Sequence, residues 1–108
     1  MSTRKDFVDY LLDQISDESA RVRAMFGEYA LYYEDVVVGL VCDNTVFIKI
    51  TPGTKRILGE DAPTGPAYPG AKPSFILSEE YLEKREELQS LIRICADDVK
   101  YMKKQKRS

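Results

Sequence analysis

The side chains best placed for chemistry lie at the C-terminus of this 108-residue chain. Residues 100–108 hold five positive charges and no acid, and we expect them to form a mobile basic tail: Lys100, Lys103, Lys104, Lys106 and Arg107. Such a cluster can contact nucleic-acid phosphates, although cations near a helix C-terminus also complement the helix dipole. Residues 1–99 carry eleven basic and eighteen acidic side chains, a charge of −7. That acidic body would repel DNA and confine any nucleic-acid contact to the tail.

The absence of histidine removes most familiar catalytic and metal sites. Without it the chain cannot form a Ser-His-Asp or Cys-His catalytic site, a Cys2His2 zinc site, an HExxH motif or a histidine haem ligand. Paired acids such as Asp17-Glu18 and Asp97-Asp98 lack EF-hand spacing, and the glycines form neither GxGxxG nor GxxxxGK(S/T). The sequence therefore predicts no catalytic residue, no metal ligand, no cofactor and a protein that is not an enzyme.

The two cysteines, Cys42 and Cys95, lie far apart inside apolar patterns and outside any CxxC motif. Thiols in such positions are typically buried and reduced. Residues 1–13 contain no hydrophobic signal core, and the longest mainly apolar stretch, Val36–Cys42, is shorter than the roughly 20 residues of a membrane helix. We therefore expect a cytoplasmic protein with no membrane contact.

The hydrophobic periodicity predicts one domain over residues 1–108, of the two-layer α+β class. Helical spacing from Phe7 to Ile15 and from Lys84 to Lys103 indicates an N-terminal and a C-terminal helix. A short helix is expected at Thr54–Leu58, and a turn or a short helical piece at Ser78–Leu82. The helices should pack on one antiparallel sheet of about five strands, at Arg21–Phe26, Glu28–Tyr33, Val36–Cys42, Thr45–Ile50 and Pro73–Leu77.

Two-residue turns are expected at Glu34-Asp35 and Asp43-Asn44, because Asp and Asn tolerate the left-handed backbone that tight hairpins need. A one-residue error in register would exchange the two faces of every strand. Counting from the turns pairs Tyr33 with Val36, Leu31 with Val38, Tyr29 with Leu40, Leu40 with Phe47, and Cys42 with Thr45.

This register gives the sheet two apolar faces. On one, the small residues Ala30 and Gly39 allow a helix to approach closely. The other is rimmed by tyrosines and a lysine, and it is the candidate interaction face: Tyr29, Leu31, Tyr33, Val38, Leu40, Phe47 and Lys49. The last helix carries an apolar stripe: Leu88, Ile92, Cys95, Val99 and Met102. We expect the candidate face, or this stripe, to bind a protein partner or to form a homodimer.

A long loop is expected over residues 60–73, which hold four of the five prolines. The simplest interpretation is a surface connection. Loops of this length are also often functional, so a partner-binding loop and a small-ligand role remain alternatives.

The stretch Met25-Phe26-Gly27-Glu28-Tyr29-Ala30-Leu31-Tyr32 resembles the Met-Phe-Gly-Gly-Tyr-Gly-Leu-Tyr signature of the TfoX/Sxy N-terminal domain family. The resemblance covers about residues 3–100, with Glu28 and Ala30 at positions where the family pattern often has glycine. Matching features follow the signature: an aliphatic strand Val36–Val41, the turn Asp43-Asn44, the strand Phe47-Ile48-Lys49 and a helix that starts with Glu86-Glu87-Leu88.

The resemblance implies a two-layer α+β fold and a regulatory role, because TfoX/Sxy proteins activate competence and DNA-uptake genes as coactivators of another transcription factor. Family members often carry a second, C-terminal domain, and we expect this chain to be a stand-alone N-terminal domain. In the signature, Met25 and Phe26 are expected to pack in the core and Gly27 to allow a bend between strands. The leading hypothesis is a non-enzymatic regulatory module that binds a protein; the alternative is a nucleic-acid-binding accessory protein that uses the basic tail.

Overall fold

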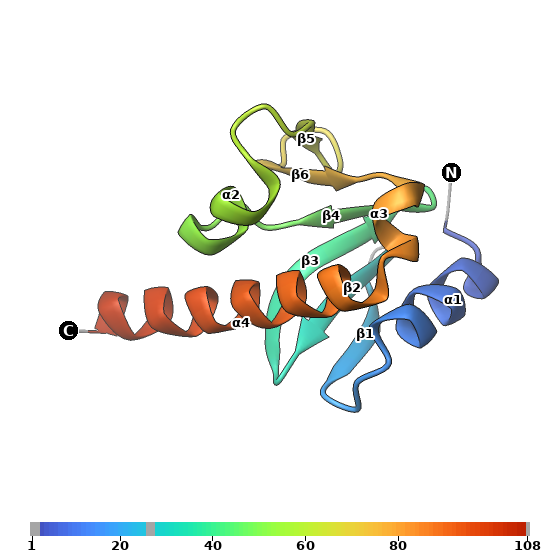
Figure 1. The fold of residues 1–108 in the computed structure, drawn as a ribbon, viewed down its shortest axis with the longest axis horizontal. Coiled ribbons are helices and arrows are strands. Elements are labelled where there is room, and N and C mark those ends of the chain that lie inside the picture. The colour runs from blue at the N-terminus through green and yellow to red at the C-terminus, as the bar shows by residue number, and fades with distance from the viewer. Residues whose placement is uncertain (1–2, 26–27, 108) are drawn as a thin grey trace.

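One antiparallel sheet of six strands forms the first layer of the protein, and helices cover one of its faces (Figure 1). The computed structural model describes residues 3–25 and 28–107, with side chains as far as residue 105. The strand order is β1-β2-β3-β4-β6-β5. The strands are β1 (Ala20–Met25), β2 (Glu28–Tyr33), β3 (Val36–Cys42), β4 (Thr45–Ile48), β5 (Thr64–Pro66) and β6 (Pro73–Leu77).

Four helices complete the chain and confirm the predicted α+β class: α1 (Lys5–Ile15), α2 (Pro52–Leu58), α3 (Glu79–Glu83) and α4 (Arg85–Arg107). The sheet has one strand more than expected, because β5 lies inside the predicted loop 60–73 and pairs with β6. Both predicted short segments are helical, as α2 and α3. The longest helix extends to Arg107, four residues beyond its predicted end at Lys103.

The two hairpin turns have the predicted left-handed backbone. Glu34 and Asp35 have φ angles of 48° and 67°, and Asp43 and Asn44 have φ angles of 51° and 56°. Turns of this kind match the right-handed twist of the strands that they join. The sequence of the two turns therefore fixes where β2 ends and where β4 begins.

The predicted register is correct next to the turns and wrong in the middle of β3. Tyr33 pairs with Val36, and Leu40 with Phe47, as expected. However, Leu31 pairs with Gly39 rather than Val38, and Tyr29 pairs with Val41 rather than Leu40. The cause is a register shift between Leu31 and Tyr32, which leaves Val38 as an extra residue in β3. Such a bulge exchanges the faces of all residues beyond it.

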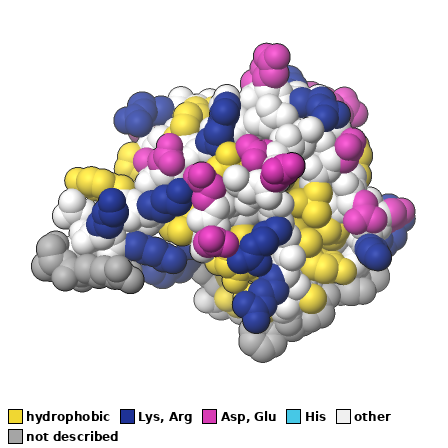
Figure 2. All heavy atoms as spheres, turned by 90° about the horizontal axis from the view of Figure 1, so that it is seen from below, with side chains coloured by type: hydrophobic (Ala, Val, Ile, Leu, Met, Phe, Trp, Pro, Cys, Tyr) yellow, Lys and Arg dark blue, Asp and Glu magenta, His cyan; other side chains and the backbone are white. Residues whose placement is uncertain are grey.

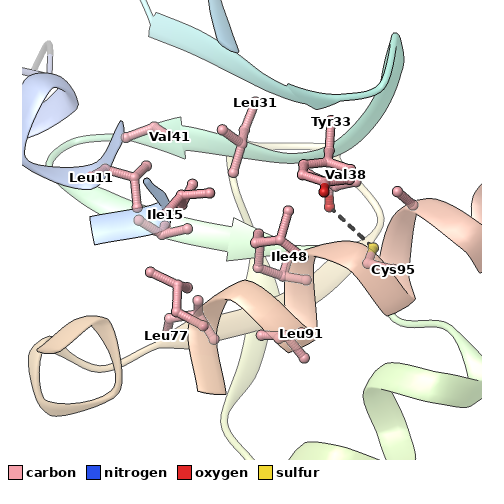
Figure 3. Close-up of a cluster of buried hydrophobic side chains, with 14 of the residues drawn as sticks. Leu11, Ile15, Leu31, Tyr33, Val38, Val41, Ile48, Leu77, Leu91 and Cys95 are labelled. Atoms are coloured by element: carbon pink, nitrogen blue, oxygen red, sulfur yellow. Dashed lines mark hydrogen bonds between the residues drawn. The ribbon is translucent and has the colours of Figure 1, made fainter. Parts of the chain in front are cut away.

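The hydrophobic core lies between the sheet and the helices (Figure 3). Leu11 and Ile15 of α1 and Leu91 of α4 are fully buried against sheet residues such as Leu31 and Ile48. The fully buried thiol of Cys95, also on α4, points at β3 and donates a hydrogen bond to the carbonyl oxygen of Val38 at 3.6 Å. The core therefore ties α4 to the bulged segment of β3.

The N-terminal segment is held on the β3–β4 turn by one carboxylate. Glu28 accepts hydrogen bonds from the backbone N–H of Thr3 at 2.9 Å and of Asp43 at 3.0 Å. The side-chain oxygen of Asn44 accepts a further hydrogen bond from the backbone N–H of Arg4 at 2.9 Å. Partial burial acts to raise the pKa of Glu28, but the hydrogen bonds from Thr3 and Asp43 outweigh it and lower this pKa below the usual value. The Glu28 side chain is therefore ionised when it accepts these hydrogen bonds.

Gly39 stands where β3 and β4 approach most closely, because a Cβ atom added there would overlap the carbonyl oxygen of Phe47. We predict that Gly39→Ala lowers the free energy of unfolding by about 2–3 kcal/mol, measured by urea denaturation. Gly65→Ala is the matched control, because its new methyl group would meet only the flexible end of Ile76 at 3.2 Å. It should cost less than about 1 kcal/mol. Equal losses for the two variants would contradict a steric role for Gly39.

Glu28→Gln should lower the free energy of unfolding by about 1 kcal/mol at neutral pH, because a neutral amide replaces a charged acceptor. The lowered pKa fixes the sign of the pH dependence. The charged group contributes fully above its unfolded pKa of 4.5, and this contribution is lost as the pH falls through the folded pKa. Thermal unfolding from neutral pH to below 4.5 should therefore show the two proteins converging. A difference that stays constant over this range would contradict the assignment.

Candidate interaction surface

The C-terminal part of α4 projects beyond the sheet (Figure 1). Val99, only 5% exposed, is the last buried residue of this helix in the part of the chain that the structure describes. Residues 101–105 are all exposed. Two of them are large and apolar: Tyr101 is 63% exposed and Met102 is 45% exposed. The structure therefore places an aromatic and a thioether side chain on a helix end without cover from the sheet.

Met102 continues the apolar stripe of α4 past the point where the core ends. It follows Val99 by three residues, so both side chains lie on the same side of the helix. The sequence pattern predicts that Met102 belongs to this stripe, and this prediction is correct. The spacing of the apolar residues does not, however, indicate where the sheet ends. Tyr101 lies three residues after Asp98, whose carboxylate accepts a hydrogen bond from the N–H of Gly53 on α2 at 2.8 Å. Tyr101 is thus on the side of α4 that faces α2.

The basic residues predicted to contact nucleic acid belong to α4, so the predicted tail is helical as far as Arg107. Lys100 forms an ion pair with Glu34 of the β2–β3 turn at 2.7 Å. Lys103 and Lys104 are exposed, and neither forms an ion pair with any side chain that the structure describes. The side chains of Lys106 and Arg107 lie outside the described part. The structure therefore brings Lys103 and Lys104 next to the two exposed apolar residues.

Figure 2 shows this combination on the projecting end of α4, at the left, where dark-blue and yellow side chains lie side by side. Over the remaining surface of that view, acidic and basic side chains are intermixed. Exposed ion pairs such as Arg21–Asp35 at 3.3 Å and Arg85–Asp13 at 3.8 Å contribute to this mixture.

The candidate interaction face predicted from the sequence is not a single surface. Leu31, Tyr33 and Val38 are 0%, 5% and 0% exposed and belong to the core beneath the helices. They are therefore unavailable to a partner, and this part of the prediction is wrong. The reason is the bulge in β3, which places Leu40, and Phe47 paired with it, on the face opposite to these core residues.

The other four residues of that predicted face differ in the side of the sheet on which they lie and in their exposure. Phe47 lies between two core residues of β4, so it points to the face without helices, and Leu40 is paired with it. Phe47 is nevertheless 8% exposed and Leu40 half-buried. Tyr29 is half-buried and packs against the core, whereas Lys49 is exposed. The seven predicted residues therefore do not form one exposed face.

Of the signature residues Met25, Phe26 and Gly27, the structure tests only the prediction for Met25. Met25 ends β1 and is 39% exposed, so the prediction that it packs in the core is wrong. Its side chain points away from the helices, because Met25 pairs with Glu28 rather than with a core residue. Phe26 and Gly27 lie outside the described residues.

Both cysteines are buried and free, as predicted. Burial raises the pKa of the Cys95 thiol to about 12 and also raises that of Cys42. Within residues 3–25 and 28–107 no group of three or more Cys, Asp or Glu side chains is arranged to hold a metal ion. No helix in these ranges is long and apolar enough to span a membrane.

Comparison with known proteins gives two matches. The model of the TfoX N-terminal domain family matches residues 11–99. A protein of Spirochaeta aurantia, described as an uncharacterized 12.7 kDa protein in the trpE 5' region, is 35% identical over 97 residues. The alignment covers 89% of this chain and 83% of the relative. Both matches extend through β1–β6 and most of α4.

The two thiols should differ in their reaction with the disulfide reagent DTNB. Only the thiolate reacts, so burial and a raised pKa protect both residues in the folded protein. Cys42, 8% exposed, should react slowly, and Cys95, 0% exposed, should react only on unfolding. The variants Cys42→Ala and Cys95→Ala separate the two rates, and urea-unfolded protein gives the reference rate. A Cys95 that reacts as fast as Cys42 in the native protein would contradict this structure.

Proposed function

Because this chain belongs to the TfoX N-terminal domain family, we propose that it is a non-enzymatic regulatory module that binds a protein partner through the projecting end of α4. The family match bears out the resemblance carried by the signature at residues 25–32. In its finer form, the proposal is a coactivator that works with a transcription factor on competence and DNA-uptake genes. Its partner-binding surface consists of Tyr101, Met102, Lys103 and Lys104, and we refer to it as the α4 surface.

The exposed apolar pair on the α4 surface carries this proposal. Tyrosine and methionine are enriched in protein interfaces. Tyrosine offers a large contact area for little loss of side-chain entropy, and the flexible thioether of methionine adapts to irregular surfaces. On a helix end that the sheet does not cover, Tyr101 and Met102 gain apolar contacts only when a second molecule covers them.

The lysines determine which kind of partner the α4 surface fits. Lys103 and Lys104 are exposed beside the apolar pair, so an acidic surface around an apolar patch is complementary to it. A symmetric homodimer through the same surface would oppose the lysines of one copy to those of the other. The partner we propose is therefore a different protein with an acidic docking site.

Nucleic acid is the competing partner for the same lysines. Two observations favour a protein. Lys100, one of the five predicted phosphate contacts, is already paired with Glu34. Residues 1–99 also carry a net charge of −7, which repels a polyanion from the body of the domain. The experiment must therefore distinguish nucleic-acid binding from protein binding at these lysines.

The double variant Tyr101→Ala, Met102→Ala tests the proposal, and alanine preserves the helix. In affinity capture from the native cell extract, the wild type should retain a transcription factor or a subunit of RNA polymerase. With that partner purified, the double variant should bind about tenfold or more weakly, because it loses two central apolar contacts. Tyr10→Ala is the matched control, since it removes a 40% exposed tyrosine from α1 and should leave the affinity unchanged.

Three results would overturn the proposal. The double variant could bind the captured partner as well as the wild type does. Light scattering could show a homodimer that the double variant abolishes. Binding to duplex or single-stranded DNA could fall steeply with salt and be lost in Lys103→Ala, Lys104→Ala but not in the apolar double variant, which would assign the α4 surface to nucleic acid.

A further inference from the structure

A second surface feature lies on the face of the sheet without helices. It is a cavity of about 550 Å³, lined by residues at the ends of β1, β2 and β3 and by the loop segment 67–69. The residues that matter for its chemistry are Met25, Glu28, Leu40, Asp43 and Tyr68. We propose that this cavity binds a small organic cation with a flat apolar body.

The size and the apolar lining of the cavity fit a ligand of this class. Small-molecule sites measure about 300–1,000 Å³ and are mostly apolar, with a few polar groups that orient the ligand. Leu40 and Met25 supply apolar surface from β3 and β1, and both are accessible: Leu40 is half-buried and Met25 is 39% exposed. The loop residues Ala67 and Pro69 line the cavity from outside the sheet. These groups favour a flat apolar body between strand and loop.

The charge of the lining selects a cation. Glu28 and Asp43 are its charged residues, both acidic, and no basic side chain lines the cavity among the described residues. The carboxylate of Glu28 is held in place by the N–H groups of Thr3 and Asp43 at 2.9 and 3.0 Å. The side chain of Asp43 is exposed on a left-handed turn residue with φ 51°. The carboxylate of Glu28 is thus ordered before a ligand binds, which reduces the cost of ordering it on binding.

One aromatic side chain adds to this selection. Tyr68, on the loop, is 56% exposed. Tyrosine rings attract cations through their π faces and stack on flat apolar groups. Tyr68 is large, apolar over most of its surface and unusually exposed, so a ligand would give it the cover that the fold does not.

This inference does not depend on the proposed function. No residue of the α4 surface lines the cavity. Loss of partner binding in the variants of Tyr101 and Met102 would therefore leave ligand binding intact. Conversely, failure of the cavity to bind a ligand would leave the proposed regulatory role untouched.

Three indole compounds of the same body and different charge test the proposal. Tryptamine is a cation, tryptophol is neutral and indole-3-propionate is an anion. Titration by calorimetry at low salt should give saturable binding of tryptamine, about tenfold tighter than that of tryptophol, since two carboxylates face the charge. Indole-3-propionate should not bind measurably. Nα-acetyl-lysine methylamide has the charge without the flat body and should bind at least about tenfold more weakly than tryptamine.

Two variants locate the site. Asp43→Asn keeps the left-handed turn, which asparagine tolerates, and should weaken tryptamine binding about threefold without affecting tryptophol. Tyr68→Ala should weaken both compounds about three- to fivefold. The controls are Asp35→Asn, at the other left-handed turn, and Tyr10→Ala on α1, which should change neither affinity.

Specific results would refute the site. Equal affinity for tryptamine and tryptophol in the wild type would refute the selection for a cation. No saturable binding of any of the indoles would refute the site itself, as would equal losses in Asp43→Asn and Asp35→Asn. Equal binding of the lysine derivative and tryptamine would overturn the flat-body requirement and indicate that the cavity receives a lysine side chain from a protein.

Discussion

The single extra residue in β3 is the constraint on which the rest of the structure depends. Val38 is inserted opposite the step from Leu31 to Tyr32. The side chains of Val38 and Val41 can therefore both face the helices, although a spacing of three positions would place them on opposite faces of a regular strand. The same insertion turns Leu40 to the face without helices. There it contributes to the cavity, while the carbonyl of Val38 accepts the thiol hydrogen bond from α4. One local irregularity therefore divides the apolar residues of the sheet between a sealed core and an accessible cavity.

The length of α4 has a comparable consequence. Its 23 residues span about 35 Å at 1.5 Å per residue, whereas the seven residues of β3, the longest strand, span about 23 Å. A straight helix of this length cannot be covered by such a sheet over all its turns. The uncovered turns are those after Val99, and contacts with neighbouring elements fix the helix up to that point. Asp98 holds the N-terminus of α2, and Lys100 pairs with the β2–β3 turn. The α4 surface is therefore carried on a firmly anchored helix.

Much of the fold could be predicted from the sequence, because local chemistry decides it. The turn residues at Glu34-Asp35 and Asp43-Asn44 specify tight hairpins, and the apolar spacing of α4 specifies a buried stripe. The bulge could not be predicted, since one inserted residue is decided by how well the sheet fits the helices, not by the strand's own sequence. Its omission is why the predicted face combined buried Leu31 with half-buried Leu40. Tyr101 and Tyr68 were missed as site residues for a related reason. Their exposure depends on where distant elements end, and residue type alone carries no such information.

The distribution of charge separates the two surfaces of the domain. The body is acidic, and its cavity presents Glu28 and Asp43, whereas the end of α4 presents lysines. A partner attracted to one surface is thus repelled by the other, so the two cannot compete for one ligand. Coupling between them would need an element with two discrete arrangements. What joins them is a sheet whose middle strands have a paired neighbour on each side and whose core is packed against α4. A paired and closely packed sheet of this kind has one arrangement and not two. We therefore expect binding at one surface to leave the affinity of the other unchanged.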